Sequence, residues 1–234
     1  MPNWVKTIVK TEPKVLKDVL EKYSNKGEFS FNKVIPMPKA LEIESGSRGE
    51  VGMMFLFLNS NDESYKSKIN KTFHSLNMFH SDIFKDIRFS EIKDNFEKYK
   101  TDSNFAESIA LGKKYIENYD KYGHATWYKW CNDNWGTKWD VSQFSHDEDT
   151  MIFETAWDFA EPVFIELSKK FPEATFLCKF ADESIRENSG IMKIENGKII
   201  EIEIGLTEKQ IENIWETYII DADYENDLEE EMEI

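Results

Sequence analysis

The residues of this chain whose types could do chemistry are few, and their clearest grouping is the run His146-Asp-Glu-Asp149. An imidazole beside three carboxylates is a donor set that a metal ion could use. Ligands of a tight site converge from several elements, however, and four adjacent residues cannot all point inward. We therefore interpret the run as a polar hairpin turn. The other histidines, His74, His80 and His124, have no partner at a ligand spacing such as His-x-x-x-His.

Nucleophile and phosphate-binding patterns are also missing from the sequence. The two cysteines, Cys131 and Cys178, lie far apart and are expected to be buried free thiols, as in a reducing cytoplasm. The chain has no Gly-rich phosphate loop, no Gly-x-Ser-x-Gly elbow and no Cys–His pairing in a suitable context. We therefore predict no catalytic residue, no metal and no cofactor, and we expect that the protein is not an enzyme.

Four tryptophans lie close together in the sequence, at positions 127, 130, 135 and 139. Exposed indoles can stack on the bases of single-stranded nucleic acids, which would make the segment an aromatic platform. Indoles at helical spacing beside a strand more often form part of a core, and we favour that interpretation. Trp127 and Trp130 are three residues apart on one helix face, and we keep this pair as candidate partner-binding residues.

The net charge is strongly negative, with 45 acids against 29 bases giving −16. The end of the chain contributes eight acids and no base: Asp221, Asp223, Glu225, Asp227, Glu229, Glu230, Glu231 and Glu233. Such a block is expected to be disordered, and it serves either as a solubilising end or as an acidic arm that docks on a basic partner. Extended binding of DNA or RNA is disfavoured, because phosphate neutralisation needs clustered Lys and Arg.

The coarse pattern predicts an α+β chain. Residues 3–10 are rich in β-branched side chains and predict a strand, followed by a helix that begins near Thr11. Two prolines in Phe29–Pro38 predict a fixed, extended connection. The apolar run Met53–Leu58 predicts a buried strand, and residues 61–122 predict two to four helices.

The second half alternates between the two kinds of element. The expected order is a helix over 124–134, strands over 139–145 and 150–157, a helix over 161–171 and a strand over 175–180. Residues 191–204 predict a hairpin. A three-residue loop with Gly197 as its bulge aligns the isoleucines on one face, so we favour it over a two-residue Asn-Gly loop. Thr207-Glu-Lys-Gln210 has the spacing of a capping box and predicts a final helix.

Several blocks in order resemble the Api92-like/YubB family of phage and plasmid proteins. They are the opening Met-Pro-Asn-Trp, the segment 31–38, the Trp-rich block 127–140 and the strand end with the following Pro at 155–162. The resemblance implies a ferredoxin-like α/β plait encoded on a mobile element, with no established activity to carry over. The word ferredoxin concerns topology only, because an iron–sulfur cluster usually needs four ligands.

Together these features predict a ferredoxin-like domain formed by residues 1–60 and 123–206, an antiparallel sheet with helices on one face. A helical insertion at 61–122, an extra hairpin, a C-terminal helix at 207–220 and the acidic tail complete the chain. No signal peptide or stretch of 18 apolar residues is present, so we expect a protein of the bacterial host cytoplasm without a membrane segment.

The functional hypothesis is a non-enzymatic accessory protein that binds a host macromolecule. The partner expected from the charge is a host protein with a basic nucleic-acid-binding surface, so the protein would be an acidic, anti-CRISPR-like inhibitor of a defence complex. The alternative is a module that binds RNA or single-stranded DNA on the sheet face. A third hypothesis, a nucleotide-processing enzyme, needs convergent carboxylates that the sequence does not locate. The oligomeric state stays open.

Overall fold

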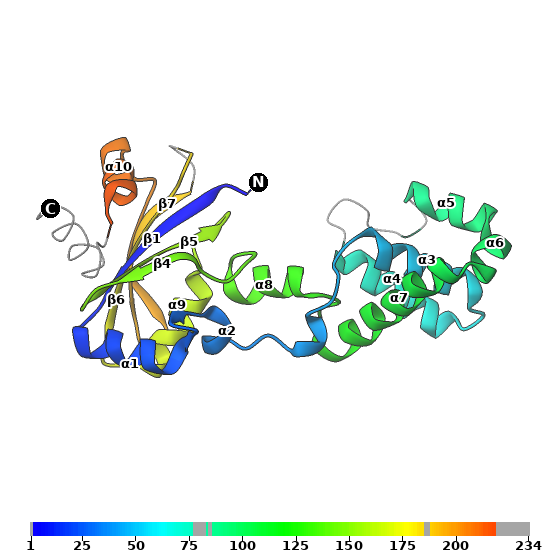
Figure 1. Ribbon diagram of the computed structural model, residues 1–234, viewed down its shortest axis with the longest axis horizontal. Coiled ribbons are helices and arrows are strands. Elements are labelled where there is room, and N and C mark those ends of the chain that lie inside the picture. The colour runs from blue at the N-terminus through cyan, green and yellow to red at the C-terminus, as the bar shows by residue number, and fades with distance from the viewer. Residues whose placement is uncertain (1, 77–82, 84–85, 185–187, 219–234) are drawn as a thin grey trace, which may run out of the picture. The chain divides into compact units, whose positions relative to one another are not determined.

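The computed structural model describes residues 2–76, 83, 86–184 and 188–218, and the chain forms two compact units (Figure 1). The first unit joins Met1–Pro36 to Cys131–Ile234 and contains the main sheet, so we call it the sheet unit. The second, Met37–Trp130, consists of helices and their connections, and we call it the helical unit.

The sheet unit contains the predicted βαββαβ plait. Its elements are β1 (Trp4–Lys10), α1 (Pro13–Tyr23), β4 (Ser142–His146), β5 (Thr150–Ala156), α9 (Glu161–Lys170) and β6 (Thr175–Asp182). Antiparallel pairing arranges the strands in the order β4-β5-β1-β6, and β7 (Ser189–Glu195) and β8 (Lys198–Ile204) extend the sheet beyond β6. The predicted α+β class and plait topology are therefore confirmed.

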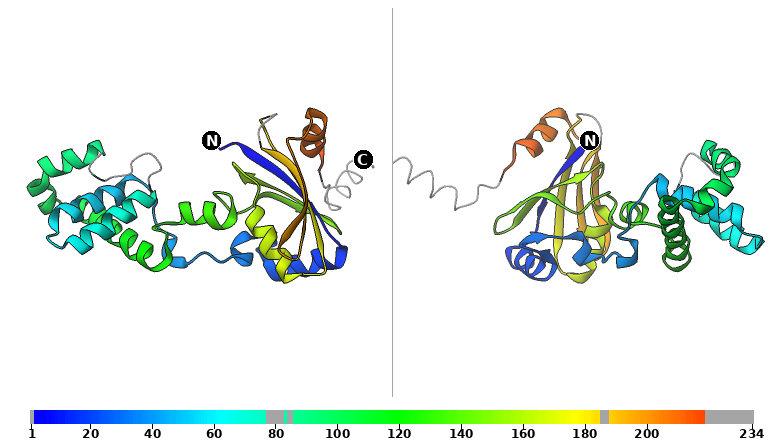
Figure 2. Two further views of the ribbon diagram at one scale, coloured as in Figure 1. Left: turned by 180° about the vertical axis from the view of Figure 1, so that it is seen from behind. Right: turned by 45° about the vertical axis from the view of Figure 1, so that its right-hand side comes forward.

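Alternation along the strands gives the sheet two different faces. On one face, Val5 and Val9 of β1 lie with aromatic rings of β5 and β6 beneath α1 and α9, and all are buried. The rings of Phe153 and Phe164 stack there with centroids 6.0 Å apart. The opposite face holds α10 (Glu208–Glu216), which lies apart from α1 and α9 in both views of Figure 2. Its buried cluster consists of Ala181, Leu206, Ile211 and Ile214, with Ile8, Ile191 and Trp215 packed against it.

The hairpin of β7 and β8 differs from the prediction. Asn196 and Gly197 alone form the loop, and both have positive φ, 42° and 75°, as a type I′ turn requires. The opposed pairs are Ile194–Ile199 before a shift in register and Met192–Ile202 after it. Ile200 is the extra residue of this bulge. The prediction of a three-residue loop was wrong because it allowed for no bulge within β8, and the bulge aligns the faces instead.

The predicted start of the last helix is confirmed. Thr207 is the N-cap of α10, and the Gln210 amide N–H donates to its Oγ1 at 3.4 Å. The Gln210 side-chain oxygen in turn accepts from the Thr207 amide at 3.0 Å. This capping box satisfies backbone donors of the first turn, so the chain enters the helix directly after β8.

The segment Phe29–Pro38 is less extended than predicted. Glu28–Phe29 forms the short strand β3, paired with β2 (Ser24–Asn25), and Phe31–Val34 forms the helical turn α2. Asp140 accepts hydrogen bonds from Ser30 Oγ and from the Phe31 amide, each at 2.7 Å. The carboxylate thus satisfies a backbone donor at the start of α2, a long-range contact that the local sequence could not predict.

The helical unit is larger than the predicted insertion over 61–122. Its helices are η1 (Lys39–Leu41), α3 (Ser47–Asn59), α4 (Glu63–Leu76), α5 (Ile87–Asp94), α6 (Phe96–Thr101) and α7 (Ser103–Tyr122), and α8 (Trp127–Trp135) crosses its boundary. The predicted strand Met53–Leu58 is wrong, since these residues lie in α3. Apolar runs of this length do not distinguish a strand from a buried helix. Because α3 packs on α7, residues 37–60 belong to the helical unit.

Candidate functional site

The most distinctive described surface is acidic and runs from β8 into α10. Residues 201–216 contain five glutamates and one base, Lys209, and all six side chains are exposed. The glutamates are Glu201, Glu203, Glu208, Glu212 and Glu216. We call this region the β8–α10 surface. It carries negative charge of one sign on a strand and on the helix that follows it after a short connection.

Three exposed isoleucines lie in the same strand as Glu201 and Glu203. Ile200, Ile202 and Ile204 have exposed fractions of 49%, 56% and 61%. Ile202 is opposite Met192 and Ile204 is opposite Gly190 in the ladder with β7. Ile202 and Ile204 therefore lie on the same face of the sheet as α9, while Glu201 and Glu203 lie on the face that holds α10.

The neighbours of the glutamates are polar and position them loosely. Gln210 Nε2 donates to Glu203 Oε1 at 3.3 Å. Lys193 Nζ lies 3.9 Å from Glu201 Oε1 but closer, 3.1 Å, to Glu195 Oε1. Its hydrogen bond to Glu195 raises the pKa of Lys193, and hydrogen bonds from Thr175 and Lys193 lower the pKa of Glu195. The lysine is thus held mainly by Glu195, which leaves most of the negative charge of Glu201 available to a partner.

A second candidate is the charge pair Lys6 and Glu154, which lie opposite each other on β1 and β5. They line a cavity of about 520 Å³ on the α10 face of the sheet. Burial lowers the pKa of Lys6 and raises the pKa of Glu154. Lys6 Nζ donates to the Trp215 carbonyl at 3.0 Å and lies 3.8 Å from the centre of the Tyr218 ring. Lys6 therefore ties the end of α10 to the sheet, which is a structural role.

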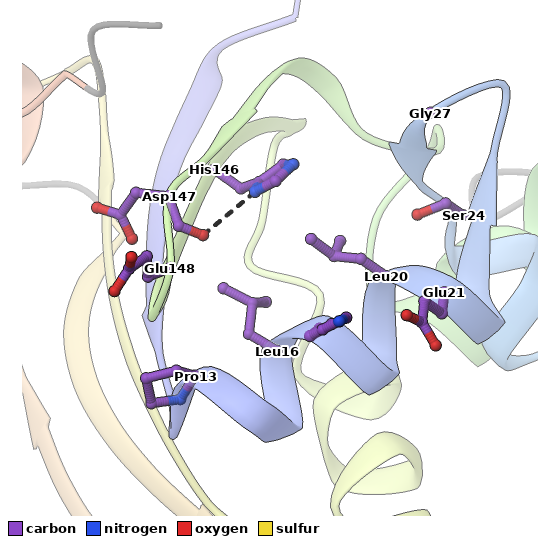
Figure 3. A pocket seen from close by; sticks show the side chains of 10 residues that line it. Pro13, Leu16, Leu20, Glu21, Ser24, Gly27, His146, Asp147 and Glu148 are labelled. Atoms are coloured by element: carbon purple, nitrogen blue, oxygen red, sulfur yellow. Dashed lines mark hydrogen bonds between the residues drawn. The ribbon is translucent and has the colours of Figure 1, made fainter. Parts of the chain in front are cut away.

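A third candidate is a groove between α1 and the β4–β5 turn (Figure 3). Its volume is about 500 Å³, and Leu16 and Leu20 of α1 point into it opposite His146. Asp147 accepts from the amides of Asp149 and Thr150 at 3.0 and 2.8 Å. Its carboxylate is therefore used to close the turn.

The run His146–Asp149 is the polar hairpin turn that we predicted. It lies between the end of β4 and the start of β5. Asp149 forms an ion pair with Lys10 at 2.8 Å, and that contact lowers the pKa of Asp149. The described residues include no group of three or more His, Cys, Asp or Glu side chains arranged to hold a metal ion.

The tryptophans do not form one exposed platform. Trp130 and Trp135 are buried, with exposed fractions of 7% and 5%, and Trp127 is half-buried. Trp135 Nε1 donates to the Ile35 carbonyl at 3.0 Å. Trp139 is more exposed and packs against Trp4, with ring centroids 6.1 Å apart. Trp130 is therefore a core residue and not the partner-binding residue that we had considered.

The other predicted partner-binding residues lie outside the described part of the chain. They are Asp221, Asp223, Glu225, Asp227, Glu229, Glu230 and Glu231. The unbroken charge of this tail indicates it in the sequence, whereas Glu201, Glu203 and the glutamates of α10 are not among the predicted residues. Alternation of Glu and Ile in residues 200–204 was the available signal. That alternation predicts the register of the β-hairpin, and it equally indicates a strand with one acidic row and one apolar row for a partner.

The second half of the chain matches a protein-family model. The model described as "Ferredoxin-like domain in Api92-like protein" matches residues 134–233. This part of the chain is similar to the ferredoxin-like domain of the Api92-like family. The crystal structure of the protein Api92 from Yersinia pseudotuberculosis is similar over 88% of this chain and 99% of that chain, with 7% sequence identity and a TM-score of 0.37. No curated protein matches the chain significantly.

The match to the Api92-like domain extends from the end of α8 through the whole β8–α10 surface. The strand β1 and helix α1, which complete the plait, precede the matched range. Within the described residues, no helix is both long and apolar enough to cross a bilayer.

Proposed function

We propose that this protein acts by binding another macromolecule and not by catalysis. Its target is a host protein with a basic nucleic-acid-binding surface. The mobile-element origin that the family resemblance implies would make it an acidic inhibitor of a nucleic-acid-handling defence complex, in the manner of an anti-CRISPR protein, working in the cytoplasm of the bacterial host.

The observation that carries the proposal is the β8–α10 surface. Five exposed glutamates against one lysine create a negative field beside three exposed isoleucines. Charge of one sign speeds the encounter with a basic partner, and adjacent apolar side chains supply burial once contact is made. The net charge of −16 acts in the same direction.

The alternative, nucleic-acid binding on the sheet face, finds less support. Helix α10 packs on β1 and β6 and occupies the middle of the face that an RNA strand would use. Lys6, a basic residue of that face, is buried beneath Trp215 and Tyr218. A binding platform needs exposed aromatic rings and available basic side chains on the same face.

The test is a pull-down from nuclease-treated bacterial lysate at low and at physiological salt. Three baits are compared: the full chain, a chain ending at Ile220, and the variant Glu208→Lys/Glu212→Lys/Glu216→Lys. We expect a basic nucleic-acid-binding protein on the full chain, with on the order of tenfold less retained at the higher salt and on either altered bait. The captured protein should then lose bound nucleic acid when the purified full chain is added.

Two results would overturn the proposal. Recovery of RNA or DNA without a basic protein, from a lysate left untreated with nuclease, would favour the nucleic-acid module. Capture that is equal at both salt concentrations and with all three baits would show that the acidic surface does not steer binding.

A further inference from the structure

The outer edge of β8 is an open strand edge with a regular pattern of side chains. We propose that it binds one extended segment of a partner protein, in which apolar residues alternate with Lys or Arg, by adding that segment to the sheet as a further strand. This inference rests on the proposed function and names how the basic partner is held.

The two edges of the sheet differ in their ability to accept a strand. The β4 edge is irregular, because its register shifts between Ser142 and Ser145 and Gln143 has a φ of 52°. Beyond the bulge at Ile200, residues Glu201–Ile204 pair regularly with β7. No described strand pairs with the other edge of β8. Its outward N–H and C=O groups are therefore a template for a further antiparallel strand.

The side chains of β8 determine what kind of strand fits. Ile202 and Ile204 project on one face of the edge, and Glu201 and Glu203 on the other. A strand added at this edge places its alternate residues directly beside these two rows. Apolar residues are favoured beside the isoleucines, and Lys or Arg is favoured beside the glutamates. The pattern thus selects an alternating apolar and basic segment.

Two other occupants are disfavoured by charge. When two copies of β8 pair with their apolar faces matched, Glu201 or Glu203 of one copy lies opposite a glutamate of the other, which is destabilising. The C-terminal tail of this chain carries eight acids and no base over residues 221–234, so its charge has the wrong sign. A basic segment of a different protein remains the complementary occupant.

The experiment measures the affinity of the full chain for a labelled synthetic peptide of four lysines alternating with three isoleucines. The variant Glu201→Lys/Glu203→Lys removes the acidic row of the edge. The control Glu208→Lys/Glu212→Lys makes the same change in net charge on α10. We expect the edge variant to bind at least about tenfold more weakly and the control to stay within about threefold, because only the edge variant replaces opposed charge pairs by like charges.

A charge swap and a backbone block keep the test independent of misfolding. A peptide of glutamates alternating with isoleucines should bind the edge variant more tightly than it binds the original chain. Two versions of the lysine peptide, N-methylated at every lysine or at every isoleucine, should behave differently. An added strand uses the amides of alternate residues only, so one version should retain its affinity and the other should lose it.

The outcomes separate the edge from the proposed function. Equal weakening by both double variants, or equal affinity of both methylated peptides, would overturn strand addition, and so would self-association of the full chain that the edge variant abolishes. A second result would overturn strand addition but keep the proposed function. In it, the variant Glu208→Lys/Glu212→Lys/Glu216→Lys loses the lysate partner and the edge variant still captures it. If the lysine peptide binds as expected but no basic protein is captured from the lysate, strand addition at β8 is supported and the proposed basic host target is overturned.

Discussion

Gly52 of α3 lies so close to Ser108 of α7 that a methyl group added at Gly52 would be 1.8 Å from the Ser108 carbonyl oxygen. Gly112 makes the same approach from the other side, where an added Cβ would be 2.6 Å from the Met53 nitrogen. The two helix backbones are therefore in direct contact, and no side chain larger than hydrogen fits between them.

We predict that Gly52→Ala destabilises the helical unit by about 3 kcal/mol. A backbone atom cannot give way as a flexible side chain can, so the helices must separate and lose packing along α3 and α7. The usual gain of roughly 1 kcal/mol for replacing a helical glycine by alanine is too small to compensate. Urea denaturation followed by far-UV circular dichroism measures the change.

Gly46 provides the matched control, because an added Cβ there meets no atom within 4 Å. Gly46→Ala should change the free energy of unfolding by less than about 1 kcal/mol. Equal stability of the Gly52→Ala and Gly46→Ala variants would contradict the close contact of α3 and α7.

A partly buried ion network provides the second prediction. Arg88 Nε donates to Asp86 Oδ1 at 2.9 Å, and an Arg88 terminal nitrogen contacts Asp86 Oδ2 and lies 2.6 Å from Glu50 Oε2. These contacts raise the pKa of Arg88 further above its already high value. Arg88→Met leaves two largely buried carboxylates without their cation, and we expect a loss of about 3 kcal/mol of stability.

Arg48 distinguishes burial from mere pairing. It also contacts two carboxylates, those of Glu44 and Glu107, but its side chain is 44% exposed. Arg48→Met should cost less than about 1 kcal/mol in the same denaturation experiment, since water screens the pair. If the two arginine variants were equally stable, burial of the Arg88 network would not matter.

The sequence predicts the plait and a helical insertion over 61–122, but it does not predict that the helical unit begins at Met37. The reason is visible in particular residues. Alternating strands such as Thr175–Asp182 and the capping box at Thr207 carry local signals, and the structure has them where expected. The run Met53–Leu58 has no usable period because it is apolar at every position, and Met53, Met54, Phe55 and Leu56 are all buried in α3. The helix on which α3 packs, α7, is remote in sequence, so a local pattern cannot reveal the contact.

For the candidate site, the acidic character follows from composition, but the exposure of single residues does not. The sequence indicates the tail, Trp127 and Trp130 as candidates, and of these Trp130 is buried. Which indole is buried depends on tertiary packing, as the hydrogen bond from Trp135 to Ile35 illustrates. The exposure of Ile202 and Ile204 likewise depends on β8 being the last strand, which follows from strand order and not from the hairpin itself.

Tyr115 supplies a prediction on pH. Its buried hydroxyl donates to the Glu44 carbonyl at 2.6 Å and accepts from the Gly46 amide at 3.1 Å. Burial raises the pKa of Tyr115 from 10.0 to about 12. Between these values the unfolded chain loses the phenol proton and the folded chain keeps it. Stability therefore falls as pH rises from 10.0 towards about 12.

Tyr115→Phe removes the phenol proton, and with it this pH dependence of stability, together with the two hydrogen bonds. The variant should be about 1 to 3 kcal/mol less stable at neutral pH, because the Glu44 carbonyl and the Gly46 amide lose their partner. Its stability should then decline less steeply than that of the original chain at alkaline pH. Denaturation curves at a series of pH values test both points, and parallel declines of the two proteins would refute the assignment to Tyr115.

The two cysteines provide the last prediction, which concerns reactivity. Burial raises the pKa of Cys178, and burial together with the negative charge of Asp140 raises the pKa of Cys131 to about 12. Thiolates are the reactive species, so neither residue should react quickly with a thiol reagent at about pH 8 while the protein is folded. In urea both thiols become accessible, and about two equivalents of reagent should be consumed.

Mass spectrometry of the labelled peptides assigns each reaction to its residue. Rapid labelling of Cys178 in the folded chain would mean that β6 opens readily, which is incompatible with its place between β1 and β7 in the sheet.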